Sequence, residues 1–355
     1  MIAAQGQRRH GSAGTASGRG ESQVMRKRLL LGLKLVVTGA FCAWIVAYVD
    51  WGQFWSTLLA SKLWAIGLVL LMRFAGLAVS AFKWQQLLAI HSTAYRFGQL
   101  IRWYLTALFL NYFLPTSIGG DGYRIYKTLN NERGKSLAVL AVFVERVTGL
   151  AALLLLGYGA AIVTYRRQGD AIAGALVTAG TIGLLTGAVA LWAVIHFRLL
   201  QRLARTKFWP KPLTTLLNLT GDYRHHPRRT VLVGLISFVF HVNKICVIWL
   251  LLYALGTTAS AFELTVAVVA ADVIGLLPIS LGGLGLVDGS FIYVMGHYGV
   301  SHETGLATML LMRTLLVPLS LTGAYFYFLG DPTARAVESE GGSFAPGHYV
   351  HTEAK

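Results

Sequence analysis

The sequence has little charge, few prolines and almost no cysteine. Only 13% of its 355 residues are charged, whereas about 25% is usual in soluble domains. The two cysteines, Cys42 and Cys246, both lie in apolar runs, which favours buried thiols over a disulfide or a metal-binding pair. These shortages exclude a disulfide scaffold, a disordered chain and a pair of soluble domains.

What the chain does contain is hydrophobic residues, at 55% of the sequence, in runs long enough to cross a bilayer. We therefore predict an all-α polytopic membrane protein over residues 26–330, with disordered polar tails at 1–25 and 331–355. The 21-residue first run exceeds the 7–15 apolar residues of a signal peptide, so we expect an uncleaved anchor. The runs are Leu29–Val49, Leu63–Phe82, Trp103–Gly120, Val147–Tyr165, Ala171–Ile195, Thr230–Leu255, Leu264–Ile292 and Thr304–Leu329.

Two of these eight runs are interrupted by proline and paired glycines. Pro115 and Gly119–Gly120 end the third run, and Pro278 and Gly282–Gly283 break the seventh. Proline removes a helix donor and glycine permits a turn. We interpret both runs as re-entrant broken helical hairpins, which leaves six full spans.

The two breaks belong to an internal repeat. Residues Leu114–Gly122 align with Leu277–Gly285, with six of nine positions identical. One copy would enter the membrane from the cytoplasm and the other from outside, which is an inverted-topology repeat. Paired broken helices in two halves point to a transporter binding site; two packing kinks with small residues are the structural alternative.

Basic residues set the predicted orientation. In this topology, 23 of the 31 Lys and Arg residues lie on the cytoplasmic side and three lie outside. By the positive-inside rule both termini are cytoplasmic, and we place the protein in a bacterial plasma (inner) membrane. The net charge of +16 is therefore an orientation signal and not a sign of nucleic-acid binding. The loop at 198–228 mixes basic and apolar residues, and either binds anionic headgroups at the cytoplasmic leaflet or is a solvated loop that only sets topology.

Several charges lie where the membrane should be, at a cost of about 2.5–3.5 kcal/mol each at mid-bilayer. Asp121 and Arg124 follow the first break and share a helix face, while Glu145 and Arg146 open the next predicted span. Three further charges, Arg73, Lys244 and Asp272, are as compatible with internal ion pairs as with a site. The candidate substrate-binding residues are Gly119, Gly120, Asp121, Arg124, Glu145, Arg146, Gly282, Gly283, Asp288 and Arg313.

The expected ligand is a lipid with a phosphate-bearing or otherwise polar headgroup. Helices restarting after the glycine pairs would direct their positive N-termini at an anion, and the Arg124 guanidinium suits phosphate. Asp121, Glu145 and Asp288 would engage a cationic or hydroxylated headgroup, or balance the arginines. The sequence contains no phosphate-binding loop, zinc-protease or nucleophile-elbow motif, so we expect no metal and no cofactor, and no enzyme activity is indicated.

Three motifs carry a family resemblance. These are Pro115–Arg124, Glu145–Leu150 and Pro278–Gly285, which in this order resemble the transmembrane domain of lysylphosphatidylglycerol synthases over residues 28–330. In bifunctional members this domain is implied to be the flippase, and a separate soluble domain transfers the amino acid from tRNA. Only 26 residues follow Leu329, so we expect a stand-alone member. Relatives often have Arg-Glu where this chain has Val287-Asp288, so the acid is kept, the basic partner is lost, and the resemblance does not imply the same headgroup specificity.

The resemblance and the residues together predict a flippase-like lipid transporter. Two other functions stay open: a membrane-embedded transferase acting on a lipid-linked sugar or an aminoacyl phospholipid, and a membrane subunit that recruits a soluble lipid-modifying enzyme. A homo-oligomer is compatible with either, and no nucleic-acid partner is expected.

Overall fold

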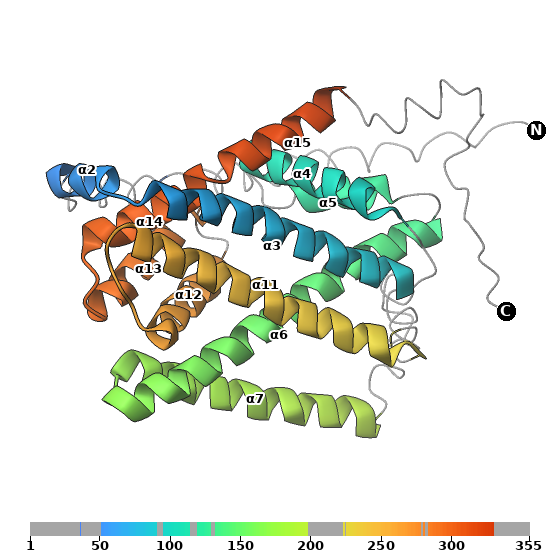
Figure 1. The fold of residues 1–355 in the computed structure, drawn as a ribbon. Helices are drawn as coiled ribbons and strands as arrows, with labels where there is room; N and C mark the ends of the chain where they lie inside the picture. Colours follow the sequence, from blue (N-terminus) through green and yellow to red (C-terminus); the bar gives the residue numbers. More distant parts are fainter. Residues whose placement is uncertain are drawn as a thin grey trace, which may run out of the picture.

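The computed structural model describes residues 36, 51–90, 95–113, 119–128, 132–197, 223, 225–277, 280 and 283–329. The regular structure of these residues is helical (Figure 1). Both tails, the first predicted span apart from residue 36, and nearly all of the 198–228 loop lie outside them. The helices are α2 (Trp51–Leu59), α3 (Leu63–Ile90), α4 (Phe97–Phe113), α5 (Gly119–Lys127), α6 (Glu132–Gln168), α7 (Ala171–Phe197), α11 (Pro227–Ala254), α12 (Ala261–Gly275), α13 (Leu286–His297), α14 (His302–Thr314) and α15 (Val317–Leu329).

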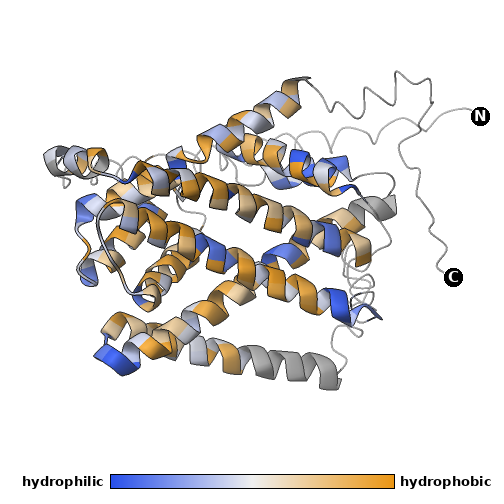
Figure 2. Cartoon of the chain, in the orientation of Figure 1, coloured by the Kyte–Doolittle hydropathy of each residue, from blue (hydrophilic) through white to orange (hydrophobic). Residues whose placement is uncertain are grey.

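The protein is a multi-pass membrane protein. Among the residues that the structure describes, four segments are long and apolar enough to cross a bilayer: Leu63–Ile90, Leu137–Gln168, Pro227–Ala254 and His302–Phe328. The fourth of these segments comprises α14 and α15. Figure 2 shows hydrophobic residues along most of α3, α6 and α11, interrupted by short hydrophilic stretches. The predicted all-α polytopic fold is confirmed.

Helices α3 and α11 pack side by side in opposite directions. The Lys62 amide at the start of α3 donates to the Ala254 carbonyl at the end of α11, at 3.0 Å. At the other end of the pair, the Arg229 guanidinium donates to the Ala89 carbonyl. The two contacts fix an antiparallel pair at the centre of the molecule.

Each helix of this pair is followed by a helical hairpin. Helices α4 and α5 pack against each other after α3, and α12 and α13 do so after α11. We call these the first hairpin and the second hairpin. Because α3 and α11 are antiparallel, the two hairpins enter the structure from opposite ends, as Figure 1 shows. This is the predicted inverted arrangement.

The two halves also exchange contacts. The first hairpin's α4 packs on α15 of the second half, and the second hairpin's α12 packs on α6 of the first half. At the α4–α15 crossing, a Cβ added to Gly323 would lie 2.0 Å from the Leu105 carbonyl oxygen. A Cβ on Gly157 would meet the Val269 side chain at 2.5 Å. Small residues allow this close helix packing, as is common in membranes.

Several sequence expectations need correction. Helix α6 begins at Glu132, so Glu145 and Arg146 lie far inside it and do not open a span. Lys83, which is one of the 23 basic residues counted on the cytoplasmic side, is buried within α3. The last span is divided after Thr314 into α14 and α15. Cys246, expected to be buried, is exposed on α11.

Candidate functional site

The first group of interior charges surrounds Arg124 on α5. Its guanidinium contacts Asp121 at 2.5 Å and Glu145 at 2.9 Å, and it donates to the Tyr104 hydroxyl. Arg146 contacts the other Asp121 oxygen at 2.6 Å. The predicted pairing of Asp121 with Arg124 on one helix face is present, and α6 supplies the remaining carboxylate.

Three residues that sequence reasoning missed complete this group. Lys83 donates to the Glu145 carbonyl at 2.8 Å, and the Tyr104 hydroxyl donates to the Glu145 carboxylate at 2.6 Å. The Trp84 ring lies 5.1 Å from the Arg124 guanidinium carbon. Lys83 directly follows an apolar run, so a longer α3 would have placed it inside. We define the first-hairpin cluster as Lys83, Asp121, Arg124, Glu145 and Arg146.

The Gly119–Gly120 pair allows α5 to restart close against α4. The Gly120 amide donates to the Asn111 side chain at 2.8 Å. A Cβ at position 120 would lie 2.4 Å from the Ala107 carbonyl oxygen, so no larger residue fits. Asn111, rather than a bound anion, thus occupies one donor at this helix N-terminus.

The second hairpin carries a comparable ion pair. Arg313 on α14 contacts the Asp288 carboxylate on α13 through Nε at 3.1 Å and Nη2 at 2.8 Å. The same carboxylate accepts the Gly285 amide at 3.0 Å. Gly283 and Gly285 have φ values of +74° and +77°, which favour glycine. Gly282 lies outside the described residues.

Arg73 adds a further cation beside this pair. Its Nη1 lies 3.7 Å from the Met312 sulfur and its Nη2 donates to the Met312 carbonyl at 3.2 Å. Its Nε is buried without a hydrogen-bond partner in the described part of the chain. We define the second-hairpin cluster as Arg73, Asp288 and Arg313.

The same sequence spacing recurs in both halves. Asp121 and Arg146 are 25 residues apart, and so are Asp288 and Arg313. In each half the aspartate lies on the second helix of the hairpin and the arginine on the next helix along the chain. Each aspartate is followed by glycine. The inverted repeat therefore includes a bound Asp–Arg pair as well as the Pro/Gly break.

The two clusters lie at different depths. The first contacts α3 at Trp84 and the second includes Arg73 of the same helix. Eleven residues of helix separate these positions, which is about 16 Å along the axis. The arginines also differ in exposure: the side chain of Arg124 is 5% exposed, whereas Arg313 is 32% and Arg146 is 64% exposed.

Comparison with known proteins agrees with this architecture. The pattern that defines the lysylphosphatidylglycerol synthase transmembrane region matches residues 30–323. The chain belongs to this family. It is also 32% identical over 80 residues to a UPF0104 membrane protein of Methanothermobacter thermautotrophicus. That similarity spans 22% of this chain and 24% of the relative.

Other interior charges form pairs outside the two clusters. Lys244 contacts Asp272 at 2.6 Å and 2.7 Å, which is the structural alternative considered for these residues. Asp170, at the turn between α6 and α7, accepts hydrogen bonds from His297, the last residue of α13, and from Tyr298, which follows it. Within the described ranges, no three His, Cys, Asp or Glu residues are grouped as metal ligands.

Proposed function

We propose that this protein moves a lipid with a phosphate-bearing or sugar-phosphate headgroup between the leaflets of the membrane. Membership of the family supports a membrane lipid function. The observation that carries the proposal is the pair of broken hairpins, which enter from opposite ends and each carry an Asp–Arg pair with the same spacing. Such paired discontinuous helices are typical of alternating-access transporters.

The charge of the two clusters favours a monoanionic phosphodiester. The first-hairpin cluster contains three cations and two anions, and the second contains two cations and one anion. Each therefore has one excess positive charge. Inside a membrane such a charge is costly unless it is compensated, and a phosphodiester supplies one negative charge.

Exposure assigns different roles to the arginines. Arg124 is buried between Asp121, Glu145 and Tyr104, so we assign it to holding α5 against α6. The side chains of Arg146 and Arg313 are partly exposed, and we assign them to the phosphate. When phosphate displaces an aspartate, Asp121 or Asp288 becomes available to a cationic or hydroxylated headgroup.

Movement of one half against the other would then carry the headgroup between the clusters. The antiparallel α3–α11 pair, which both halves share, is the natural axis for this motion. We also propose that both termini lie in the cytoplasm of an inner-membrane protein, because 23 of the 31 Lys and Arg residues fall on that side in the predicted topology. Anionic headgroups at that face and a soluble lipid-modifying enzyme are the proposed partners.

The test is a lipid-translocation assay in proteoliposomes. Purified protein is reconstituted with a fluorescent phosphatidylglycerol and no donor substrate, and the label reaching the outer leaflet is bleached by a membrane-impermeant reductant. We expect Arg146→Ala and Arg313→Ala each to slow translocation roughly tenfold or more, because each loses a charge-assisted hydrogen bond. Arg166→Ala, also exposed on α6, is the matched control and should retain the wild-type rate.

Two results would overturn the proposal. One is translocation no faster than in protein-free vesicles for the wild type. The other is a covalently altered lipid that forms when an aminoacyl or glycosyl donor is supplied, which would indicate a transferase. Equal translocation rates for Arg146→Ala and Arg166→Ala would show that the first-hairpin cluster does not take part in lipid translocation.

A further inference from the structure

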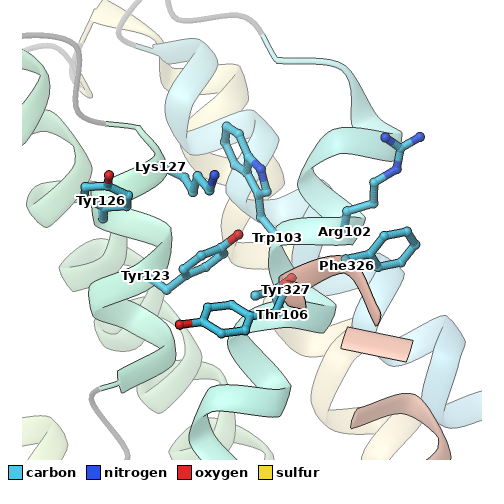
Figure 3. Close-up of a pocket in the computed structure, with 8 residues that line it drawn as sticks. All are labelled: Arg102, Trp103, Thr106, Tyr123, Tyr126, Lys127, Phe326 and Tyr327. Atoms are coloured by element: carbon cyan, nitrogen blue, oxygen red, sulfur yellow. The ribbon is translucent and has the colours of Figure 1, made fainter. Parts of the chain in front are cut away.

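A separate cavity lies between α4, α5 and α15, outside both charge clusters. Its volume is 230 Å³, and Figure 3 shows its lining residues. Two cations, Arg102 and Lys127, border it, together with the hydroxyl-bearing side chains of Thr106, Tyr123 and Tyr327. The cavity thus combines cations, hydroxyl donors and aromatic rings, which is a chemistry suited to a phosphate on an apolar molecule.

The geometry arranges these groups around one space. The Tyr123 and Tyr327 rings lie 6.4 Å apart, edge to face. The Lys127 amine is 5.7 Å from the Tyr123 ring centre, and the Arg102 guanidinium carbon is 5.9 Å from the Phe326 ring centre. Lys127 forms no ion pair with a carboxylate in the described part of the chain. Its charge is therefore available to an anion.

The surroundings of the cavity favour a lipid over a free anion. Helix α15 exposes Leu321, Tyr325 and Phe328, with Phe328 73% exposed. These side chains would meet acyl chains beside the cavity, while the cavity itself holds a headgroup. Four lining residues, Tyr126, Lys127, Phe326 and Tyr327, belong to the last turns of α5 and α15, and helix ends of a membrane protein lie near the level of the lipid headgroups.

The cavity also adjoins the first-hairpin cluster. Tyr123 precedes Arg124 on α5, and Trp103 of the cavity wall lies 6.1 Å from Trp84, which in turn faces Arg124. Asp121, which contacts Arg146, lies on α5 two residues before Tyr123 of the cavity wall. We propose that this cavity binds the phosphate of an anionic lipid from the adjacent leaflet and, resting on the proposed function, that it is the loading site for transport.

Binding is tested by native mass spectrometry of the full chain with phosphatidylglycerol, phosphatidylcholine or inorganic phosphate. The double variant Arg102→Ala/Lys127→Ala should bind phosphatidylglycerol roughly tenfold or more weakly than wild type, because two charge-assisted contacts are lost. Lys62→Ala is the control, since Lys62 also lies over an aromatic ring, Tyr253 at 3.7 Å, at the opposite end of α3. Unchanged thermal unfolding of each variant shows that the fold is intact.

The outcomes separate the sources of the phosphate. A selective loss of phosphatidylglycerol binding in the double variant supports the lipid-binding site. If Lys62→Ala loses as much phosphatidylglycerol binding as the double variant, the lipid binds to a general interfacial belt of aromatic residues and cations. That result would overturn the inference. Competition by inorganic phosphate at millimolar concentration, without preference for phosphatidylglycerol over phosphatidylcholine, would identify a free anion as the ligand and would also overturn it.

The loading role has its own readout in the translocation assay. We expect the double variant to translocate slowly at a low fraction of labelled lipid and to approach the wild-type rate at a high fraction, because loading and not transfer is impaired. Weak binding with unchanged translocation at every lipid fraction would refute the loading role and leave the proposed function standing. If the wild type does not translocate lipid but still binds phosphatidylglycerol selectively, the proposed function is refuted and the lipid-binding site still stands.

Discussion

Arg124 illustrates how burial and partners decide the role of an interior arginine. Its guanidinium is 5% exposed and is held by two carboxylates and a phenol. Breaking a buried ion pair by removing one partner is costly because the other charge remains buried. Arg124 is therefore better suited to fixing the first hairpin than to releasing and rebinding a substrate.

We predict that Glu145→Gln destabilises the protein by roughly 3 kcal/mol, since Arg124 keeps its charge but loses one of two carboxylates. The measurement is the midpoint of thermal unfolding in detergent. Glu303→Gln is the matched control, because Glu303 forms no ion pair among the described residues, and it should change stability by less than about 0.5 kcal/mol. Equal midpoints for the two variants would contradict the structural role of Arg124.

A double-mutant cycle makes this prediction specific. Arg124→Met combined with Glu145→Gln removes both charges, so neither charge is left buried without its partner. We expect the double variant to be more stable than the sum of the single changes indicates. Additive losses would show that the two side chains act independently.

At the residue scale, local spacing predicted only part of the site. Asp121 and Arg124 are three residues apart on one helix, so their contact follows from helix geometry. The positions of Glu145 and Lys83 depend on where α6 begins and α3 ends. Polar residues at those helix ends lower the local hydropathy, so a hydropathy analysis does not locate the two boundaries. The Arg73–Met312 contact joins residues 239 apart and requires the tertiary fold.

At the scale of elements, Asp170 joins the turn before α7 to the end of α13. Its carboxylate accepts the Ala173 amide at 2.7 Å and the Tyr298 hydroxyl at 2.9 Å, and it also contacts His297. Burial alone would raise the pKa of Asp170, but the hydrogen bonds from Ala173, His297 and Tyr298 outweigh it and hold the pKa below its ordinary value of 3.8. Burial and the Asp170 carboxylate raise the pKa of Tyr298, so its phenol remains a donor.

This contact predicts a defined pH window. A carboxyl whose pKa is lowered by folding stabilises the native state above its unfolded pKa, and the contribution disappears as pH falls through the folded pKa. We expect Asp170→Asn to lower the unfolding midpoint at pH 7. The difference from wild type should stay nearly constant down to about pH 5 and shrink below pH 3.8.

Tyr298→Phe provides the second arm of this experiment. It removes one donor to the carboxylate, so the folded pKa of Asp170 moves toward its ordinary value. The stability lost on acidification should therefore be smaller than in wild type and should be complete at a higher pH, because the loss runs from the unfolded pKa down to the folded pKa. An Asp170→Asn difference that does not change between pH 7 and pH 3 would contradict the assignment.

The sequence predicted helical hairpins correctly where proline and glycine interrupt an apolar run. Both hairpins were predicted because a lipid-exposed break would leave backbone groups unpaired, which makes each break a structural signal. The division between α14 and α15 carries a weaker signal: the intervening Leu315 and Leu316 are apolar, and Pro318 follows them at the start of α15 without a glycine pair. Similarly, the α4–α15 crossing depends on Gly323, one glycine among 39.

At the scale of the whole molecule, the two halves are related by an inversion that is seen in the helix directions, the helix contacts and the residue spacing. The antiparallel α3–α11 pair, the opposite hairpins, the exchanged α4–α15 and α12–α6 contacts and the 25-residue Asp–Arg spacing all follow one relation. An inversion of this kind gives a transporter two equivalent conformations, each open to one side. The inversion therefore links the architecture to the proposed transport.

The inversion makes a topology prediction that does not depend on transport. With Cys42 and Cys246 replaced, single cysteines are introduced at Arg96, before the first hairpin, and at Ser260, before the second; both positions are exposed. A membrane-impermeant maleimide applied to oriented vesicles should label Arg96→Cys from the side of the termini and Ser260→Cys from the opposite side. Ser61→Cys, which precedes α3, should be labelled from the same side as Ser260→Cys, because the Lys62 amide is hydrogen-bonded to the end of α11. Labelling of Arg96→Cys and Ser260→Cys from the same side cannot be reconciled with antiparallel α3 and α11, and would remove the geometric basis for two oppositely facing sites.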